Sequence, residues 1–307
     1  MGRYLTRRVL QFIPVFIGAT FLIFALVFMI PGDPIRALSG DKPLPQSVQD
    51  TLRAQYNLDK PLWQQYALYV GGVVQGDFGE DFRGRDVREI MTERIPVTAR
   101  LAIYAFLFEM VIGIIAGIMA GLNFGGFIDN LIRISTLVVI SIPIFVFGFM
   151  AQLLIGVRFD LLPVSGLRDG QASYIMPAIV LGSVSLAYIA RLTRTSLAEN
   201  MRADYVRTAT AKGLTRRRVV GVHALRNSMI PVITFLGVDL GALMGGAIIT
   251  EAIFNLPGIG NAVYQATLRQ EGTVVVGIVT FLVLVFMISN LLVDVLYAVL
   301  DPRIRYE

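Results

Sequence analysis

The stretch DYVRTATAKGLTRRRVVGVHALRN, residues 204–227, is basic and helix-forming, yet it lies between two apolar runs that are long enough to cross a membrane. The wider segment 197–228 holds seven basic and two acidic side chains, which gives it a net charge of +5. Such a segment has to meet either the water beside a bilayer or a protein there. The rest of the sequence decides between these two possibilities.

The composition indicates an integral membrane protein. The chain has 307 residues, of which 55% are hydrophobic and 16% charged, whereas a soluble domain carries about a quarter charged residues. Cysteine is absent, which excludes disulfides, thiolate metal sites and thiol nucleophiles. The single histidine, His223, excludes a metal site built from several histidines, so no metal site is predicted.

Six apolar runs reach the roughly 17 residues needed to cross the hydrocarbon core of a bilayer. In lipid each run must satisfy its own backbone hydrogen bonds, so the predicted fold class is an all-α membrane protein with six transmembrane helices. The first run is expected to be a retained span, because it is longer than the apolar part of a signal peptide. Prolines inside the runs predict kinks at Pro14, Pro143 and Pro177. The runs are 9–30, 101–122, 134–157, 174–190, 229–250 and 274–300.

The distribution of Lys and Arg predicts the orientation in the membrane. Fifteen of them lie on the side that holds both termini and the basic segment, and three lie in the short loops opposite. By the positive-inside rule, both termini and residues 204–227 are expected to be cytoplasmic. The long segment 31–97 is then outside, and it is nearly balanced, with 8 basic and 10 acidic residues.

Three regions follow from this topology. Residues 1–30 form the cytoplasmic start and the first span, residues 31–97 an extracytoplasmic helical insertion, and residues 98–307 a five-helix core. Within the insertion, apolar residues at helical spacing from Val48 and again after Pro61 predict short amphipathic helices. These helices either lie on the bilayer surface or present a docking surface to an extracytoplasmic partner, and the two interpretations are compatible.

Residues 204–227, which we call the elbow, are predicted to form a helix, a glycine turn and a second helix. Gly213 occupies the position where a left-handed residue ends a helix. Thr215 can cap the second helix, which is expected to end near Asn227. The small residues 209–211 would then form a tip that fits a groove on another protein. The alternative is a basic loop that only sets topology and meets anionic lipid.

The elbow resembles the EAA loop of permease subunits of ATP-binding-cassette importers. That motif reads E-A-A, three residues, G, nine residues, I-x-L-P, and with its glycine on Gly213 only Ala209, Gly213 and Leu225 match. Arg207 stands where the motif has its glutamate. The variant YVRTATAKGL is instead similar to the dipeptide/oligopeptide branch. So are RRVLQFIPVFIGATFLIF with PGDP, LDKPLWQQY with GDFG, and FNLPGIG, which occur in order along nearly the whole chain.

The resemblance implies a type I importer transmembrane domain (MetI-like) with an EAA coupling loop at 197–228, in a bacterial inner membrane. It implies a heterodimer with a sibling permease, two ATPase subunits, and an extracytoplasmic binding protein that delivers a peptide. Other members of this branch carry nickel complexes, glutathione or haem, and these substrates remain open. The expected coupling residues are Asp204, Tyr205, Arg207, Thr208, Ala209, Ala211, Lys212, Gly213 and Leu214.

The chain itself is not predicted to be an enzyme. It contains no GxxxxGK[ST], HExxH or GxSxG, so no cofactor is expected on it, and ATP and magnesium are expected on partner subunits. A secondary transporter without an ATPase would fit acids in the spans, but it would leave the elbow without a role. A membrane-embedded enzyme or a scaffold is a third class, and no catalytic constellation supports the enzyme.

Two spans carry the pattern GxxxGxxxG, which lets another helix backbone approach closely. These ridges either pack statically or slide during a change of state. They comprise Gly113, Gly117 and Gly121 in the second span and Gly237, Gly241 and Gly245 in the fifth.

Acids within the spans are candidates for the translocation path, because an unpaired charge is costly in the hydrocarbon core. Asp239 lies about 200° around its helix from the glycine ridge, where it could face water and attract a substrate ammonium. Glu109 shares the face of Gly113 and is expected to meet a neighbouring helix. The path candidates are Asp239, Glu109, Leu243 and Gly246.

Overall fold

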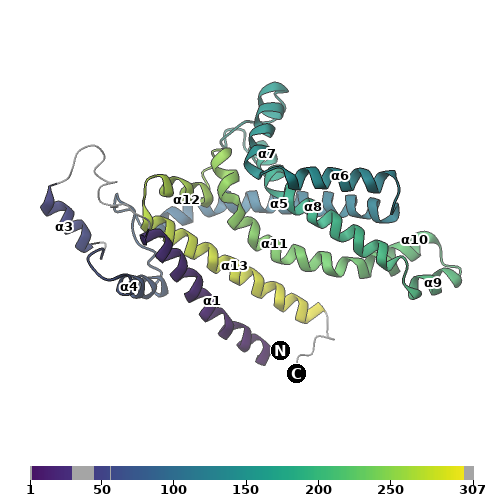
Figure 1. Ribbon diagram of the computed structural model, residues 1–307, viewed down its shortest axis with the longest axis horizontal. Coiled ribbons are helices and arrows are strands. Elements are labelled where there is room, and N and C mark those ends of the chain that lie inside the picture. Colours follow the sequence, from purple (N-terminus) through teal and green to yellow (C-terminus); the bar gives the residue numbers. More distant parts are fainter. Residues whose placement is uncertain (1, 30–44, 56, 301–307) are drawn as a thin grey trace. The chain divides into compact units, whose positions relative to one another are not determined.

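The computed structural model describes residues 2–29, 45–55 and 57–300, and within these ranges it contains helices and no strand, which confirms the all-α prediction (Figure 1). The chain divides into a central unit, residues 99–256, and a terminal unit, residues 1–98 and 257–307. The helices are α1 Gly2–Met29, α3 Gln46–Gln55, α4 Leu62–Val74, α5 Val87–Leu122, α6 Phe127–Ser141, α7 Ile144–Ala151, η1 Gln152–Arg158, α8 Ala172–Asn200, α9 Asp204–Ala211, α10 Arg216–Arg218, η2 Val219–Ala224, α11 Leu225–Ile253, α12 Ile259–Leu268 and α13 Gly272–Leu300.

Five helices are long and apolar enough to cross a membrane, and a sixth span results if α6 and the following α7–η1 segment count as one. That pair is bent by 103°. The kink predicted at Pro143 in the run 134–157 is therefore confirmed, and it is sharp enough to divide that run into two helices. Proline has no backbone N–H and pushes the residue before it out of the helical region, and Ile142 before Pro143 is indeed extended (φ −92°, ψ 124°). Pro14 and Pro177 lie inside α1 and α8 without ending them.

In the central unit, the glycines of α5 let α8 approach closely. A Cβ added at Gly113 would lie 2.9 Å from Ile189 Cγ2, and one added at Gly117 would lie 2.7 Å from the carbonyl oxygen of Ala190. At Gly121 the corresponding distance to the carbonyl oxygen of Arg194 is 3.1 Å. The first predicted ridge is thus a helix-packing surface, and α8 is its partner.

The ridge of α11 differs. Gly241 is buried, but Gly245 is exposed, and a Cβ added there would meet no atom within 4 Å. The contact of α11 with α8 is instead made by side chains: Val232 and Leu236 pack with Ile189, and the Ser228 hydroxyl lies 3.3 Å from the carbonyl oxygen of Ser196. Close backbone packing at Gly245 is therefore not found in the central unit.

The second helix of the elbow does not end near Asn227, as predicted, but runs on into α11. Residues Arg216–Ile253 form one helical rod of 38 residues that contains the π-helical turn η2. The polar residues at the expected end bond within the helix: the Asn227 amide donates to the His223 carbonyl at 3.2 Å, and the Ser228 hydroxyl donates to the Ala224 carbonyl at 2.8 Å. Because both side chains bond to carbonyls one turn earlier in the same helix, neither caps a helix end at this position.

In the terminal unit, α4 contacts α1 and α13 through its tyrosines. The Tyr66 hydroxyl donates to the carbonyl of Ile17 at 2.9 Å, and the Tyr69 hydroxyl donates to that of Val276 at 3.3 Å. Both rings pack against Phe24, whereas Trp63 is 65% exposed. Burial raises the pKa of Tyr69 to about 12. The predicted amphipathic face of α4 is confirmed.

The stretches GDFG and FNLPGIG form close turns. Gly79 adopts φ +88°, and the Phe78 carbonyl oxygen would lie 2.7 Å from a Cβ added at Gly277 of α13. The Thr98 hydroxyl accepts a 2.8 Å hydrogen bond from the N–H of Ile259, at the start of α12. The PGDP stretch, residues 31–34, lies outside the described residues.

Candidate functional site

The elbow has the predicted glycine turn. Gly213 adopts φ +76°, which favours glycine strongly over residues with a Cβ. It follows the C-terminus of α9, and its N–H donates to the carbonyl of Thr210 at 2.9 Å. Thr215 takes the extended N-cap position of α10, but its side chain makes no capping hydrogen bond there. The turn therefore depends on glycine more than on a threonine cap.

A compact apolar core supports this turn and joins four helical segments of the central unit. Ile118 and Leu122, from the end of α5, pack against its edge. Ala209 is only 5% exposed, so the prediction that it contributes to an exposed tip is wrong. The small side chain is needed because α9 lies against η2. The buried members of this core are Leu197, Val206, Ala209, Val219 and Ala224.

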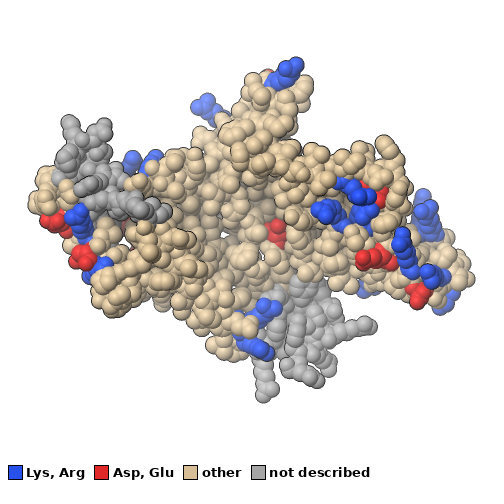
Figure 2. Space-filling view, in the orientation of Figure 1, with Lys and Arg blue, Asp and Glu red and all other residues tan. Residues whose placement is uncertain are grey.

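The outer face of α9 is polar and open to solvent. Arg207 and Asp204 form an exposed i, i+3 pair at 3.5 Å, which contributes little stability, and the Thr208 hydroxyl donates to the Asp204 carbonyl at 2.9 Å. The Tyr205 hydroxyl donates to the Asn200 side chain, and Lys212 is exposed. Figure 2 shows basic side chains gathered over the α9–α10 region.

A groove of about 650 Å³ opens on the elbow. Among the expected coupling residues, Arg207, Ala211 and Leu214 line it, together with Thr210 and Arg216. The rest of its lining is apolar and comes from Met201, Val206, Val219 and Val220. Leu214 is half-buried and also packs against the apolar core, so the groove and the core share one wall.

Two of the acids in the spans, Glu109 and Asp239, lie together, which the sequence did not indicate. Glu109 of α5 is fully buried, and its carboxyl lies beside that of Asp239 of α11. Ser185 of α8 donates a 3.1 Å hydrogen bond to Asp239 Oδ1. Among the remaining path candidates, Leu243 is buried, whereas Gly246 is exposed. Three helices of the central unit thus meet at polar side chains inside an apolar bundle.

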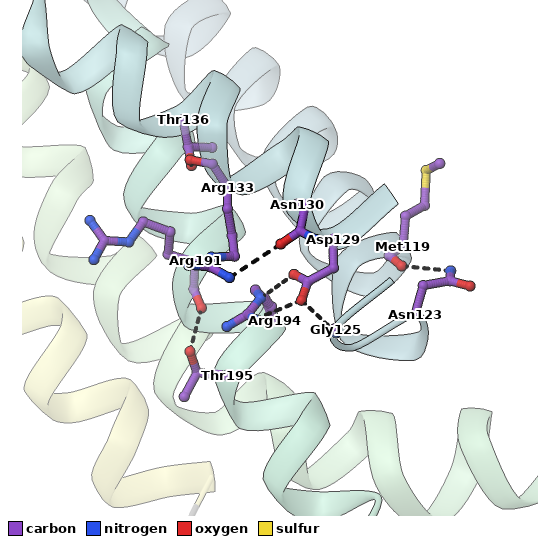
Figure 3. A network of polar contacts seen from close by, with 10 residues as sticks. All are labelled: Met119, Asn123, Gly125, Asp129, Asn130, Arg133, Thr136, Arg191, Arg194 and Thr195. Carbon is purple, nitrogen blue, oxygen red and sulfur yellow. Dashed lines mark hydrogen bonds and ion pairs between the residues drawn. The ribbon is translucent and has the colours of Figure 1, made fainter. Parts of the chain in front are cut away.

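A second polar cluster, also missed from sequence, lies near the C-terminal end of α8 (Figure 3). Arg194 of α8 makes a two-pronged contact with the fully buried Asp129 of α6 through its Nε and through its Nη2, the latter at 2.7 Å. Asp129 Oδ2 also accepts the N–H of Gly125 at 2.8 Å. The sequence signal that could have indicated this pair is the opposite charge of Asp129 and Arg194, which both lie near the predicted cytoplasmic ends of spans.

Comparison with known proteins identifies the relatives of the chain. Residues 113–306 match the family described as binding-protein-dependent transport system inner membrane component, and residues 1–102 match its N-terminal companion. The dipeptide transport system permease protein DppB of Escherichia coli (strain K12) is 40% identical, and the di/tripeptide permease DppB of Pseudomonas aeruginosa (strain UCBPP-PA14) is 39% identical. The glutathione transport system permease protein GsiC of Escherichia coli (strain K12) is 36% identical. In each case the whole of both chains is covered.

Among solved structures, a chain of the MetNI methionine ABC transporter in an inward-facing conformation is similar in fold. The TM-score is 0.58 at 20% identity, over 69% of this chain and 96% of that one. At this identity the likeness shows the fold, and it agrees with the expected type I transmembrane architecture.

Proposed function

Because the chain belongs to the family of binding-protein-dependent transport system inner membrane components, we propose that it is a permease subunit that imports peptides at the expense of ATP hydrolysed by two partner subunits. It is a multi-pass protein of the inner membrane. In the proposed assembly it pairs with a sibling permease, and a binding protein delivers the peptide from outside. Both termini and the elbow are cytoplasmic in this proposal, in line with the excess of Lys and Arg on that side.

The elbow is the observation that carries the proposal. Its outer face presents exposed charged and polar side chains, and its inner face is anchored on the apolar core with Leu197 and Val219. It is therefore a stiff projection that a partner can hold from one side. A loop that only met anionic lipid would need the charge but not the core.

The elbow is also joined directly to the bundle. Its first helix follows α8 after three residues, and its second helix continues into α11 as the 38-residue rod. When ATP draws two partner subunits together, an elbow held by one of them moves with it, and α8 and α11 must follow. The binding energy of ATP is then spent on shifting the bundle between two packings.

Exchange of Gly213 for valine tests this role. A β-branched residue at φ +76° is strained, although there is free space around Gly213. We expect Gly213→Val to insert into the membrane normally, to retain less of the ATPase subunits on co-purification, and to lose most peptide uptake. Gly221→Val is the matched control, since Gly221 also has open space around it but no positive φ. Full uptake by Gly213→Val would refute the coupling role.

The substrate is proposed to be a peptide, and glutathione is the second candidate because a full-length relative is named for its transport. Asp239 is proposed to attract the ammonium group of the substrate. Glu109 is completely buried beside Asp239, so it is proposed to support Asp239 and not to contact the substrate itself. Uptake of a labelled dipeptide by cells carrying the complete system should be inhibited by unlabelled dipeptides. Stronger inhibition by glutathione than by any dipeptide would reverse the assignment.

A further inference from the structure

The contact between Asp129 and Arg194 joins the α5–α6 turn to the last turns of α8. Asp129 lies in the first turn of α6, where the positive end of the helix dipole stabilises its carboxylate. The carboxylate also accepts a hydrogen bond from the N–H of Gly125 in the preceding turn. Arg194 lies six residues before the end of α8. Its guanidinium meets both carboxylate oxygens, and this fixes orientation as well as distance.

A second contact connects the same turn with the start of the elbow. The ring of Phe124 lies under two guanidinium groups, with Arg194 Cζ 4.5 Å and Arg202 Cζ 5.1 Å from its centroid. Arg202 belongs to the three residues between α8 and α9. The α5–α6 turn therefore contacts both the end of α8 and the segment that leads into α9.

We propose that Asp129, Arg194, Phe124 and Arg202 form a clamp that makes the α5–α6 turn move as one body with the elbow, so that Asp129 is a positioning residue for energy coupling. The inference rests on the proposed function, because it assumes that a partner moves the elbow. A buried ion pair adds little net stability compared with apolar packing, but it fixes one register. Here the fixed register is that of α6 against α8.

The clamp couples the elbow to α6, a helix that is not adjacent to the elbow along the main chain. Thr136, the other buried residue of α6, bonds to the Arg133 carbonyl of its own helix at 3.0 Å, so this bond does not fix α6 against α8. With the clamp, a shift of α9 passes to α6 and then to the 103° bend before α7, which itself packs against α8 and α11. Three helices of the central unit then respond to one displacement.

The experiment compares coupling with assembly in the complete complex, reconstituted in vesicles with its ATPase subunits. Asp129→Asn keeps the shape of the side chain and an acceptor for Gly125 but removes the charge that holds Arg194. We expect the ATPase subunits to remain bound and the amount of labelled dipeptide imported per ATP hydrolysed to fall about tenfold, a typical size for coupling between sites. Asn130→Ala, on the same helix, removes only the 3.3 Å bond to Arg133 and should leave the ratio unchanged. An unchanged ratio in Asp129→Asn would overturn the proposal.

A distance measurement tests the clamp even if Asp129→Asn assembles poorly. The chain has no cysteine, so spin labels can be placed on cysteines introduced at the exposed Arg217 of the elbow and Ile134 of α6, with cysteine-free ATPase subunits. With Asp129 present, the distance between the labels should be the same without nucleotide and with trapped ATP. A shift of this distance on trapping ATP would show that α6 and the elbow move separately, which overturns the clamp but leaves ATPase docking at the elbow intact. Loss of ATPase binding by Gly213→Val concerns only the proposed function.

Discussion

Two runs with the same spacing of glycines behave differently in this molecule. In α5, the run from Gly113 to Gly121 lies against the backbone of α8, whereas in α11 the last glycine of the run, Gly245, is exposed with open space around it. The motif therefore indicates that another helix backbone can approach closely, but it does not show that one does so. Which ridge lies against a neighbour depends on the neighbouring helix: carbonyl groups of α8 lie close to the α5 glycines, whereas α8 meets α11 through side chains such as Ile189 and Ser185.

Gly117→Ala should have the largest effect on stability. The added methyl would lie 2.7 Å from the Ala190 carbonyl oxygen and even closer to the Thr193 side chain, so the two backbones must separate. We expect a loss of about 2 kcal/mol, typical of overpacking, seen as a lower melting temperature of the purified protein in detergent. An unchanged melting temperature would show that α5 and α8 are not in close contact.

Gly121→Ala should have a smaller effect of the same sign. Its added methyl would lie 3.1 Å from both the Arg194 carbonyl oxygen and Leu197 Cβ, which requires a shift of only a few tenths of an ångström. We expect a loss of about 1 kcal/mol in the same melting experiment. A loss larger than that of Gly117→Ala would mean that the closest approach lies at the other end of the ridge.

Gly245→Ala should have the smallest effect, and of opposite sign. A methyl group there meets nothing within 4 Å, and alanine favours the helix over glycine. We expect a gain of about 0.5 kcal/mol when the chain is purified alone. Destabilisation of the isolated chain would show that another part of the same chain covers this ridge.

Local chemistry explains what could be predicted from the sequence. The sequence predicts the left-handed turn at Gly213 and a kink at Pro143, because both effects belong to single residues. The sequence predicts too early an end for the elbow's second helix, because the Asn227 side chain can cap a helix but instead bonds inside the rod. Sequence spacing alone does not tell whether the Asn227 amide caps a helix end or bonds inside a continuous helix.

Contacts between distant helices could not be predicted in the same way. Asp129 and Arg194 are 65 residues apart, and Glu109 and Asp239 lie on different spans, so each pairing depends on how far one helix is shifted along another. The small size of Ala209 predicts a place at the tip of the elbow, but size alone does not tell which side of α9 faces inward. The register of packed helices supplies the missing information.

The rod from Arg216 to Ile253 has a geometric consequence. At 1.5 Å per residue its 38 residues measure about 57 Å, so a tilt of about five degrees around one end displaces the other by about 5 Å. A movement too small to break any packing at the elbow would then become, at the other end of the rod, a displacement as wide as an amino-acid side chain. The continuous rod, whose turns include the π-helical turn η2, would then act as a lever.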